Sequence, residues 1–339
     1  MQENKRRAFL KTVSAAAVAS AGSFAPVFSF AAEHTLRLAN NLPVSHPLNL
    51  RLKEMAERVK AESKGRVEIQ VFPSSQLGSD TDTLSQIRSG AVDFFTLSPL
   101  ILGTFIPAAQ ISGIGFAFKS YDKVWAALDG ELGAYVRNKI EASSLFAFEK
   151  IWDGGFRQIT TSSKPIARPE DLQGIKLRVP PSPLWTSMFR AFGTSPTSIN
   201  FSETYSALQT RVVEGQENPL SIIFTAKLYE VQKFCSLTQH MWDGFWLLGN
   251  KASFARLPKN LQEIVRRAAN DAALKQRADV QALDSEVRAR LEKAAMRFND
   301  VNADPFRAKL ASAKFYEEWR KKFGPEAWGL LEKYSGRLG

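Results

Sequence analysis

The sequence has few of the side chains from which disulfides and metal centres are built. Its 339 residues include one cysteine, Cys235, and three histidines. A single cysteine excludes an internal disulfide, and His34, His46 and His240 are too far apart in the chain to form a recognisable metal motif. We therefore expect no metal site. Cys235 lies in the apolar run 231–237 and is expected to be a small buried apolar residue.

Signatures of catalysis are also missing. The chain has no Gly-x-Ser-x-Gly elbow, no phosphate-binding loop that ends in Gly-Lys-Ser/Thr and no dinucleotide-binding glycine fingerprint. These absences argue against the common hydrolase and nucleotide-dependent classes without excluding an enzyme, and we expect no cofactor and no enzymatic activity. An exported enzyme that folds around a cofactor is the alternative from a different functional class.

Basic residues are plentiful but not clustered. The formal net charge is +11, which favours anionic partners in general. Lysine and arginine are spread along the chain without interleaved aromatics, so no nucleic-acid partner is expected. The mildly apolar stretch 12–21 is too short for a convincing membrane anchor.

The first 31 residues resemble an export signal, which predicts a periplasmic location. Lys5, Arg6, Arg7 and Lys11 form a basic region, an apolar stretch follows, and residues 29–31 form a small-x-small cleavage site. The paired arginines favour twin-arginine export, with the general secretory route as the alternative. The folded part is expected to begin near residue 32.

Apolar periodicity predicts an α/β fold. Alternating apolar residues at 36–38 and 67–71 flank a helical pattern at 48–59, for which Ser45 is the expected N-cap and Gly65 the expected stop. Such a strand–helix–strand unit favours parallel pairing. A long helix is expected between 258 and 298. The same reasoning predicts elements at 82–89, 92–97, 121–142, 145–151, 157–161, 175–179, 183–192, 202–213 and 215–218.

Three polar side chains stand out at strand ends. Arg178 closes an alternating strand just before two prolines, Arg157 follows the glycine pair 154–155, and Asn218 ends a short strand before another proline. A guanidinium offers two parallel donors that match a carboxylate, and an amide can donate a further hydrogen bond. Each residue alone is equally compatible with a solvated surface.

Together with residues 72–78, 201–209, 229–234 and 250–258, these motifs resemble the DctP-type solute-binding receptors of tripartite ATP-independent periplasmic (TRAP) transporters. The resemblance implies a two-lobed periplasmic-binding-protein fold, type II-like, with mixed sheets flanked by helices and a long helix that spans both lobes. It also implies a receptor that delivers an organic acid to the membrane subunits of a TRAP permease, and we expect a monomer.

Lobe boundaries follow from the same resemblance. Lobe I would comprise 32–153 plus about 244–283, and lobe II 154–243 plus about 284–339. The first crossing between the lobes is expected at residues 152–155.

The resemblance also implies site residues. Arg178 would grip the ligand carboxylate, with Arg157 and Asn218 as its companions. Four more residues would face the cleft, although Phe201 could equally belong to the core and Asp80 to a solvated loop. These four are Asn41, Asp80, Phe201 and His240.

Ligand identity is where the chain departs from sialic-acid receptors of the family. The segment 98–101 lacks their Glu and Arg, and Pro181 stands where they have Asn. Four tryptophans fall in segments that line or flank the cleft in relatives: Trp152, Trp185, Trp242 and Trp246. Trp152 and Trp242 are the preferred candidates for the cleft, although each tryptophan is also compatible with the core. We therefore expect a monocarboxylate or aromatic acid, with a C4-dicarboxylate as the alternative.

Overall fold

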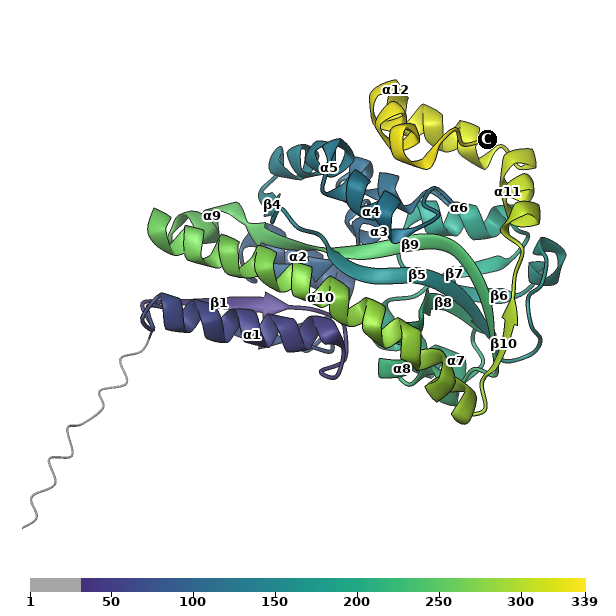
Figure 1. The fold of residues 1–339 in the computed structure, drawn as a ribbon, viewed down its shortest axis with the longest axis horizontal. Helices are drawn as coiled ribbons and strands as arrows, with labels where there is room; N and C mark the ends of the chain where they lie inside the picture. The colour runs from purple at the N-terminus through teal and green to yellow at the C-terminus, as the bar shows by residue number, and fades with distance from the viewer. Residues whose placement is uncertain (1–31) are drawn as a thin grey trace, which may run out of the picture. The chain divides into compact units, whose positions relative to one another are not determined.

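The computed structural model describes residues 32–339. The expected export signal lies outside them. Among the described residues, no helix combines the length and the apolarity needed to span a bilayer. Figure 1 shows strands gathered at the centre with helices on either side.

The first half of the chain alternates strands and helices as its periodicity predicts. In order, its elements are β1 (His34–Ala39), α1 (Pro47–Glu62), β2 (Val67–Phe72), α2 (Asp80–Ser89), β3 (Phe94–Leu97), α3 (Pro99–Leu102), η1 (Pro107–Gly113), α4 (Tyr121–Leu128), α5 (Glu131–Glu141), β4 (Leu145–Ala147) and β5 (Trp152–Thr161).

The second half continues with shorter strands and ends in helices. Its elements are η2 (Pro169–Leu172), β6 (Lys176–Val179), α6 (Pro183–Ala191), β7 (Ser195–Ser198), α7 (Phe201–Gln209), β8 (Gly215–Pro219), α8 (Leu220–Thr225), η3 (Leu228–Glu230), β9 (Phe234–Asn250), α9 (Lys251–Ala255), α10 (Lys259–Lys293), β10 (Arg297–Asp300), α11 (Ala303–Ser312) and α12 (Phe315–Ser335).

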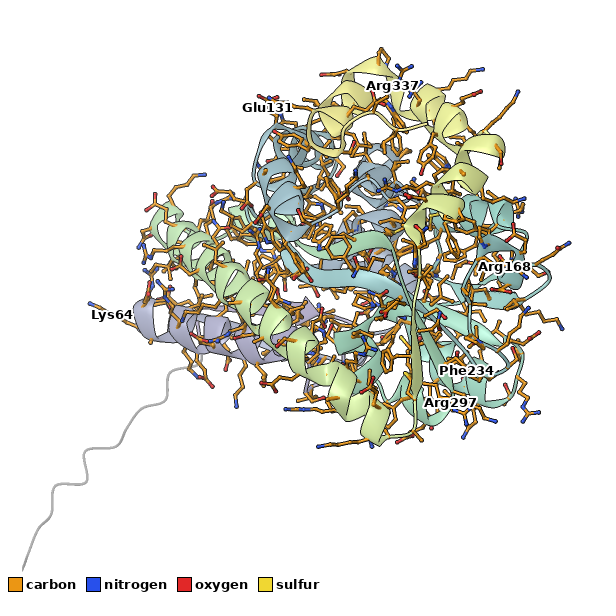
Figure 2. The ribbon with its side chains drawn as sticks, turned by 45° about the vertical axis from the view of Figure 1, so that its right-hand side comes forward. Lys64, Glu131, Arg168, Phe234, Arg297 and Arg337 are labelled. Carbon is orange, nitrogen blue, oxygen red and sulfur yellow. The ribbon has the colours of Figure 1, made fainter. Side chains whose placement is uncertain are left out.

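The long strands β5 and β9 connect the shorter strands into one mixed sheet of order β2-β1-β3-β9-β5-β8-β6-β7. The short pairs β1–β2, β1–β3, β6–β7 and β6–β8 are parallel. By contrast, β9 runs antiparallel to β3, β4 and β5. The carboxyl-terminal end of β9 pairs with β3 and β4, and the rest of β9 pairs with β5. The amino-terminal end of β9 also pairs with β10, where Arg297 lies beside Phe234 (Figure 2).

Helix α1 shows how local sequence sets an element. Its apolar side chains at helical spacing, including Leu48, Leu52 and Val59, are fully buried. The expected cap at Ser45 was wrong, because His46 is the N-cap and its Nδ1 accepts a hydrogen bond from the Leu48 amide at 3.2 Å. Pro47 explains why the N-cap is His46, since the fixed φ of proline suits the first helical position.

The long helix predicted after residue 258 is α10, with 35 residues, which at 1.5 Å per residue extends over roughly 50 Å. It packs against α1, β5 and α8 (Figure 1). Two adjacent side chains tie it to the start of β5. The Gln276 amide bonds both the N–H and the C=O of Asp153 at 2.8 Å, and Arg277 donates to the Ile151 carbonyl and to Asp129.

The segment 152–155, expected as a crossing point, is an irregular part of β5. The register with β9 shifts between Asp153 and Gly155. Gly155 has φ +113°, and a Cβ there would lie 3.0 Å from Pro219 and 3.3 Å from the Asp284 carboxylate. Only glycine therefore allows this close approach between β5, β8 and α10.

Two carboxylates accompany this irregularity: Asp153 is buried and Asp284 is half-buried. Asp153 accepts a hydrogen bond from the Trp242 indole at 2.9 Å, while its other oxygen is unpartnered among residues 32–339. Burial raises the pKa of Asp153 to about 8 and that of Asp284 to about 7. Asp153 therefore favours its protonated form at neutral pH, whereas Asp284 is divided between its two forms there.

We predict that Asp153→Asn changes how stability depends on pH. The unfolded pKa is about 3.9, so the folded parent retains its proton to higher pH than the unfolded chain. The associated stability is fully present below about pH 4 and is lost as pH rises towards 8, by at most about 1.4 kcal/mol per pH unit. Urea unfolding between pH 4.5 and 8.5 should show the variant gaining stability relative to the parent as pH rises. The exposed Asp122→Asn is the control, and parallel curves for parent and Asp153→Asn would contradict the prediction.

Candidate functional site

Neighbouring strands bring three of the predicted site residues together. Arg157 on β5, Asn218 on β8 and Arg178 on β6 meet a loop after β1 and the first turn of α2 around one small cavity. The cavity has a volume of about 20 Å³. Its lining comprises Asn41, Leu42, Asp80, Ser98, Ile101, Arg157, Arg178, Pro180, Trp185, Phe201, Asn218, Ile222, Asp243 and Phe245.

Arg178 is a buried cation with spare donors. Its side chain is 1% exposed, its Nε donates to the Ile199 carbonyl at 2.9 Å, and its Nη1 has no hydrogen-bond partner in the described part of the chain. The guanidinium carbon lies 5.9 Å from the centre of the Phe201 ring. Burial lowers the pKa of Arg178 to about 10, so the group is still charged at neutral pH. An anion brought to Nη1 would offset the cost of burying this charge.

Arg157 lies in the same cavity but its donors are already engaged. It forms a two-pronged ion pair with Glu217, and its Nη1 lies 3.2 Å from Asp243. A further bond from Nη2 reaches Asn218 Oδ1 at 3.0 Å, and the guanidinium lies 4.7 Å from the Trp185 ring centre. Arg157 therefore differs from Arg178, because a ligand would have to compete for its hydrogen bonds.

Glu217 holds Arg157 and His240 together behind the cavity. Burial opposes its ionisation, but the charge of Arg157 and the bonds from Arg157 and His240 outweigh burial and lower the pKa of Glu217. His240 Nε2 lies 3.1 Å from Glu217 and its Nδ1 lies 2.7 Å from Thr238 Oγ1. Burial lowers the pKa of His240, which favours the neutral ring. His240 is fully buried and does not line the cavity, unlike the placement expected from the sequence.

Asn218 lines the cavity with its amide bonded on both sides. Its Oδ1 accepts from Arg157, and its Nδ2 donates to Gln216 Oε1. The Gln216 side chain in turn donates to Thr160 Oγ1 at 2.7 Å. The chain of bonds holds the Asn218 amide in one orientation.

Asn41 and Asp80 present spare acceptors on the opposite side. Asn41 Nδ2 donates to Asp80 Oδ2 at 2.9 Å. The remaining oxygens, Asn41 Oδ1 and Asp80 Oδ1, are buried without a partner among the described residues. Burial raises the pKa of Asp80 to about 6. The cavity thus offers free donors on Arg178 and free acceptors on Asp80 and Asn41.

Tryptophan placement differs from the sequence-based preference. Trp185 lines the cavity, whereas Trp152, Trp242 and Trp246 pack in the hydrophobic core. Trp242 forms an edge contact with Trp125 and donates to Asp153. Large aromatics fill cores as readily as clefts, and strand alternation alone does not reveal which sheet face meets a cavity.

Sequence reasoning missed Glu217, Asp243 and Ser98 as parts of the site, and it named Trp185 without preferring it. Asp243 accepts from Ser98 Oγ at 2.8 Å as well as from Arg157, and burial raises its pKa to about 6. The sequence contained a signal for Asp243, since an aspartate in a strand with apolar neighbours is rarely buried without a partner.

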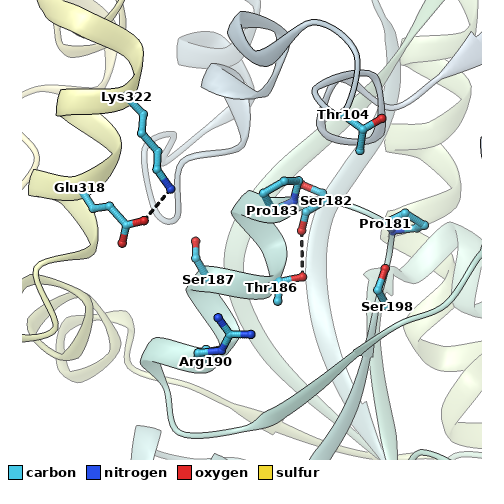
Figure 3. Close-up of a pocket in the computed structure, with 10 residues that line it drawn as sticks. All are labelled: Thr104, Pro181, Ser182, Pro183, Thr186, Ser187, Arg190, Ser198, Glu318 and Lys322. Atoms are coloured by element: carbon cyan, nitrogen blue, oxygen red, sulfur yellow. Dashed lines mark hydrogen bonds and ion pairs between the residues drawn. The ribbon is translucent and has the colours of Figure 1, made fainter.

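A larger hollow of about 520 Å³ lies beyond the turn at 180–183 (Figure 3). Several of its lining side chains are hydroxyls, including Ser187 and Ser198, and Glu318 and Lys322 pair with each other. Arg190 is exposed. The hollow therefore lacks the buried unpaired charge that distinguishes the Arg178 cavity. Among residues 32–339, no group of three or more metal-ligating side chains is arranged to hold a metal ion.

Comparison with known proteins places the chain in a family. The model of bacterial extracellular solute-binding protein, family 7 (DctP), matches residues 38–322. A solute-binding protein of Roseobacter denitrificans is 31% identical over 91% of this chain and 94% of its own length. The uncharacterised protein y4mM of Sinorhizobium fredii is 34% identical over 91% of this chain, which spans 57% of that relative's length.

Solved structures of TRAP periplasmic solute-binding proteins are similar to this chain. A TRAP periplasmic solute-binding protein from Sulfurospirillum deleyianum with bound succinate has a TM-score of 0.84 at 28% identity, covering 91% of this chain and 100% of that one. A protein from Roseobacter denitrificans with bound L-galactonate has a TM-score of 0.83 at 28% identity, covering 90% and 99%. The match confirms a mixed α/β fold flanked by helices. The chain belongs to the DctP family and is a TRAP transporter solute-binding protein.

Proposed function

We propose that this protein is a periplasmic receptor that captures a hydroxylated organic acid with a single carboxylate and delivers it to a TRAP permease. The observation that carries the proposal is the buried Arg178 guanidinium, whose Nη1 has no partner in the described chain. A carboxylate accepts two hydrogen bonds from such a fork. Binding without chemical conversion follows from the family, and we propose that the receptor acts as a monomer.

Two unpartnered acceptors in the cavity support the proposal that the ligand carries hydroxyl groups. Asp80 Oδ1 and Asn41 Oδ1 are buried and unpartnered within residues 32–339, and leaving such atoms without a donor is costly. A ligand hydroxyl supplies that donor. Relatives in solved structures hold D-erythronate and galactonate, which are hydroxy acids.

The remaining lining explains why two other ligand classes rank lower. An aromatic body was expected from Trp152 and Trp242, which lie in the core, although Trp185 and Phe201 still provide apolar surface. A second ligand carboxylate would enter a cavity that already contains Asp80 and Asp243. A dicarboxylate is therefore disfavoured by like-charge repulsion.

Entry of the acid requires the site to open. A cavity of about 20 Å³ is near the size that holds one water molecule, roughly 10–15 Å³. We propose that lobe I, 32–153 with about 244–283, and lobe II, 154–243 with about 284–339, separate by bending where β5, β9 and α10 pass between them. Asn41 and Asp80 would then move away from Arg178, and an acid that pairs with Arg178 would stabilise the closed arrangement.

A thermal-shift panel tests the ligand class. D-erythronate, D-galactonate and pantoate should stabilise the protein more than succinate or benzoate, because only they combine one carboxylate with hydroxyl donors. At a concentration 100 times the dissociation constant the gain is about 2.7 kcal/mol. A larger shift with benzoate would favour the aromatic alternative, and one with succinate would favour the dicarboxylate.

Arg178 substitutions test the anchor. We expect Arg178→Ala to abolish acid binding and Arg178→Lys to weaken it by on the order of 10- to 100-fold, because lysine does not reproduce the planar fork. Calorimetric titration measures both. Arg168→Lys, at an exposed arginine, is the matched control and should bind like the parent. Parent-like affinity in Arg178→Lys would contradict the assignment.

Small-angle scattering tests closure. The radius of gyration should fall when the protein is saturated with the acid that gives the largest thermal shift, and the saturated profile should match the one calculated from residues 32–339. Because each lobe would retain its own packing, the change in the radius of gyration should come only from the distance between the lobes. An unchanged radius at saturation would exclude the proposed movement.

A further inference from the structure

The charges around the cavity are unbalanced before any acid enters. Two guanidinium groups face it, those of Arg157 and Arg178, together with the carboxylates of Asp80 and Asp243. Glu217 adds a third carboxylate directly behind Arg157. If all five are ionised, the group carries one net negative charge. A bound carboxylate would bring the total to two negative charges in a buried site, which is energetically unfavourable.

Neighbouring ionisable groups do not correct this imbalance. His240 faces Glu217, but its pKa is lowered by burial, so the ring contributes no reliable positive charge. Glu203 on α7 is near Arg178 and would add further negative charge, although it is exposed and therefore screened. No other cationic side chain lines the cavity within the described residues.

The three carboxylates differ in how well their charged forms are supported. Glu217 accepts two guanidinium bonds and lies within hydrogen-bonding distance of His240. Asp243 is bonded by Arg157 Nη1 and Ser98 Oγ. Asp80 accepts a hydrogen bond from the neutral Asn41 amide, and the Phe201 backbone N–H also favours its anion. No charged side chain of residues 32–339 donates a hydrogen bond to Asp80, and its Oδ1 is unpartnered there. Asp80 is therefore the carboxylate that gains most from a proton.

The Asn41 hydrogen bond gives the Asp80 anion its largest support, and the charge of Arg178 gives the next largest. Burial raises the pKa of Asp80 to about 6, while the Asn41 hydrogen bond and the charge of Arg178 act in the opposite direction. A ligand carboxylate that pairs with Arg178 cancels much of that charge. The pKa of Asp80 should then rise above its value in the ligand-free protein.

We propose that capture of the acid is coupled to uptake of one proton from solvent by Asp80. The proton adds to a carboxylate oxygen of Asp80, and no other bond forms or breaks. Asp80 thereby gains an O–H donor, which can bond a carboxylate or hydroxyl oxygen of the ligand, and it keeps acceptor capacity on its oxygens. Asn41 Oδ1 remains an unpartnered acceptor for a ligand hydroxyl among the described residues. This coupling rests on the proposed function, because it requires an anionic ligand at Arg178.

The sign of the pH dependence follows from the change at Asp80. Below about pH 6 Asp80 already holds its proton before binding, so little uptake occurs. Above that pH the free protein is ionised and must gain a proton on binding. Affinity should therefore fall as pH rises, by up to tenfold per pH unit, until the pH passes the pKa of Asp80 in the complex.

Calorimetry measures the proton directly. The acid from D-erythronate, D-galactonate, pantoate and succinate that gives the largest thermal shift is titrated at pH 7.5 in phosphate and in Tris, whose ionisation enthalpies differ. We expect uptake of 0.5 to 1 proton by the parent. Asp80→Asn should bind with no uptake and with a dissociation constant that is nearly constant between pH 6 and 8. Asp153→Asn, which removes a buried acid outside the cavity, should retain the uptake.

The outcomes separate this inference from the proposed function. If none of the four acids binds, the proposed ligand class is wrong and the coupling is wrong with it. Binding by the parent without proton uptake overturns the coupling alone, as does unchanged uptake in Asp80→Asn. If Asp80→Asn fails to fold or bind, carboxyl ¹³C NMR of the parent decides, since the Asp80 signal should shift to the protonated position only when the acid is added at pH 7.5.

Discussion

The site depends on a difference between two buried arginines in how their charges are compensated. Arg157 is neutralised by a two-pronged ion pair with Glu217 and by Asp243, whereas Arg178 has one carbonyl contact and an unpartnered Nη1 within the described chain. A buried ion pair is a fixed part of the structure, because separating it leaves both charges desolvated. A buried cation without an anion is a group whose burial a bound carboxylate would offset. Arg157 therefore shapes the cavity and Arg178 leaves it incomplete.

The sheet order is compatible with the proposed opening of the cavity. β5, β8 and β6 are neighbours, and Arg157, Asn218 and Arg178 on these strands line the same cavity. Asp80 and Asn41 come from α2 and the loop after β1, at the other end of the strand order. The two groups are joined mainly through β9 and α10, so bending these elements would separate donors from acceptors without unpacking either half. The Gly155 irregularity lies at that junction.

The apolar parts of the cavity and its carboxylates act together. Trp185, Ile222 and Phe245 exclude water, which strengthens every electrostatic interaction that they surround. The same exclusion raises the pKa values of Asp80 and Asp243 to about 6. The chemistry that makes Arg178 attractive to an anion thus also makes the nearby carboxylates sensitive to that anion's arrival.

Much of this could be read from the chain alone. Apolar alternation and helical spacing predicted β1, α1, β2 and α10, since these signals are local, and the strand-end motifs identified Arg178, Arg157 and Asn218. Local signals did not reveal β9, a strand of 17 residues whose apolar run is buried on both faces and therefore lacks alternation. They also did not separate Trp185, at the cavity, from Trp152 and Trp242, in the core.

Sequence motifs carried the likeness to an acid-binding receptor, and the guanidinium fork of the arginines in those motifs matches a carboxylate. Only tertiary structure decided which arginine is free. That choice depends on Glu217 and Asp243, which lie 60 and 86 residues from Arg157 along the chain. Charge compensation is set by distance in space and by burial, and neither is encoded at a single position in the sequence.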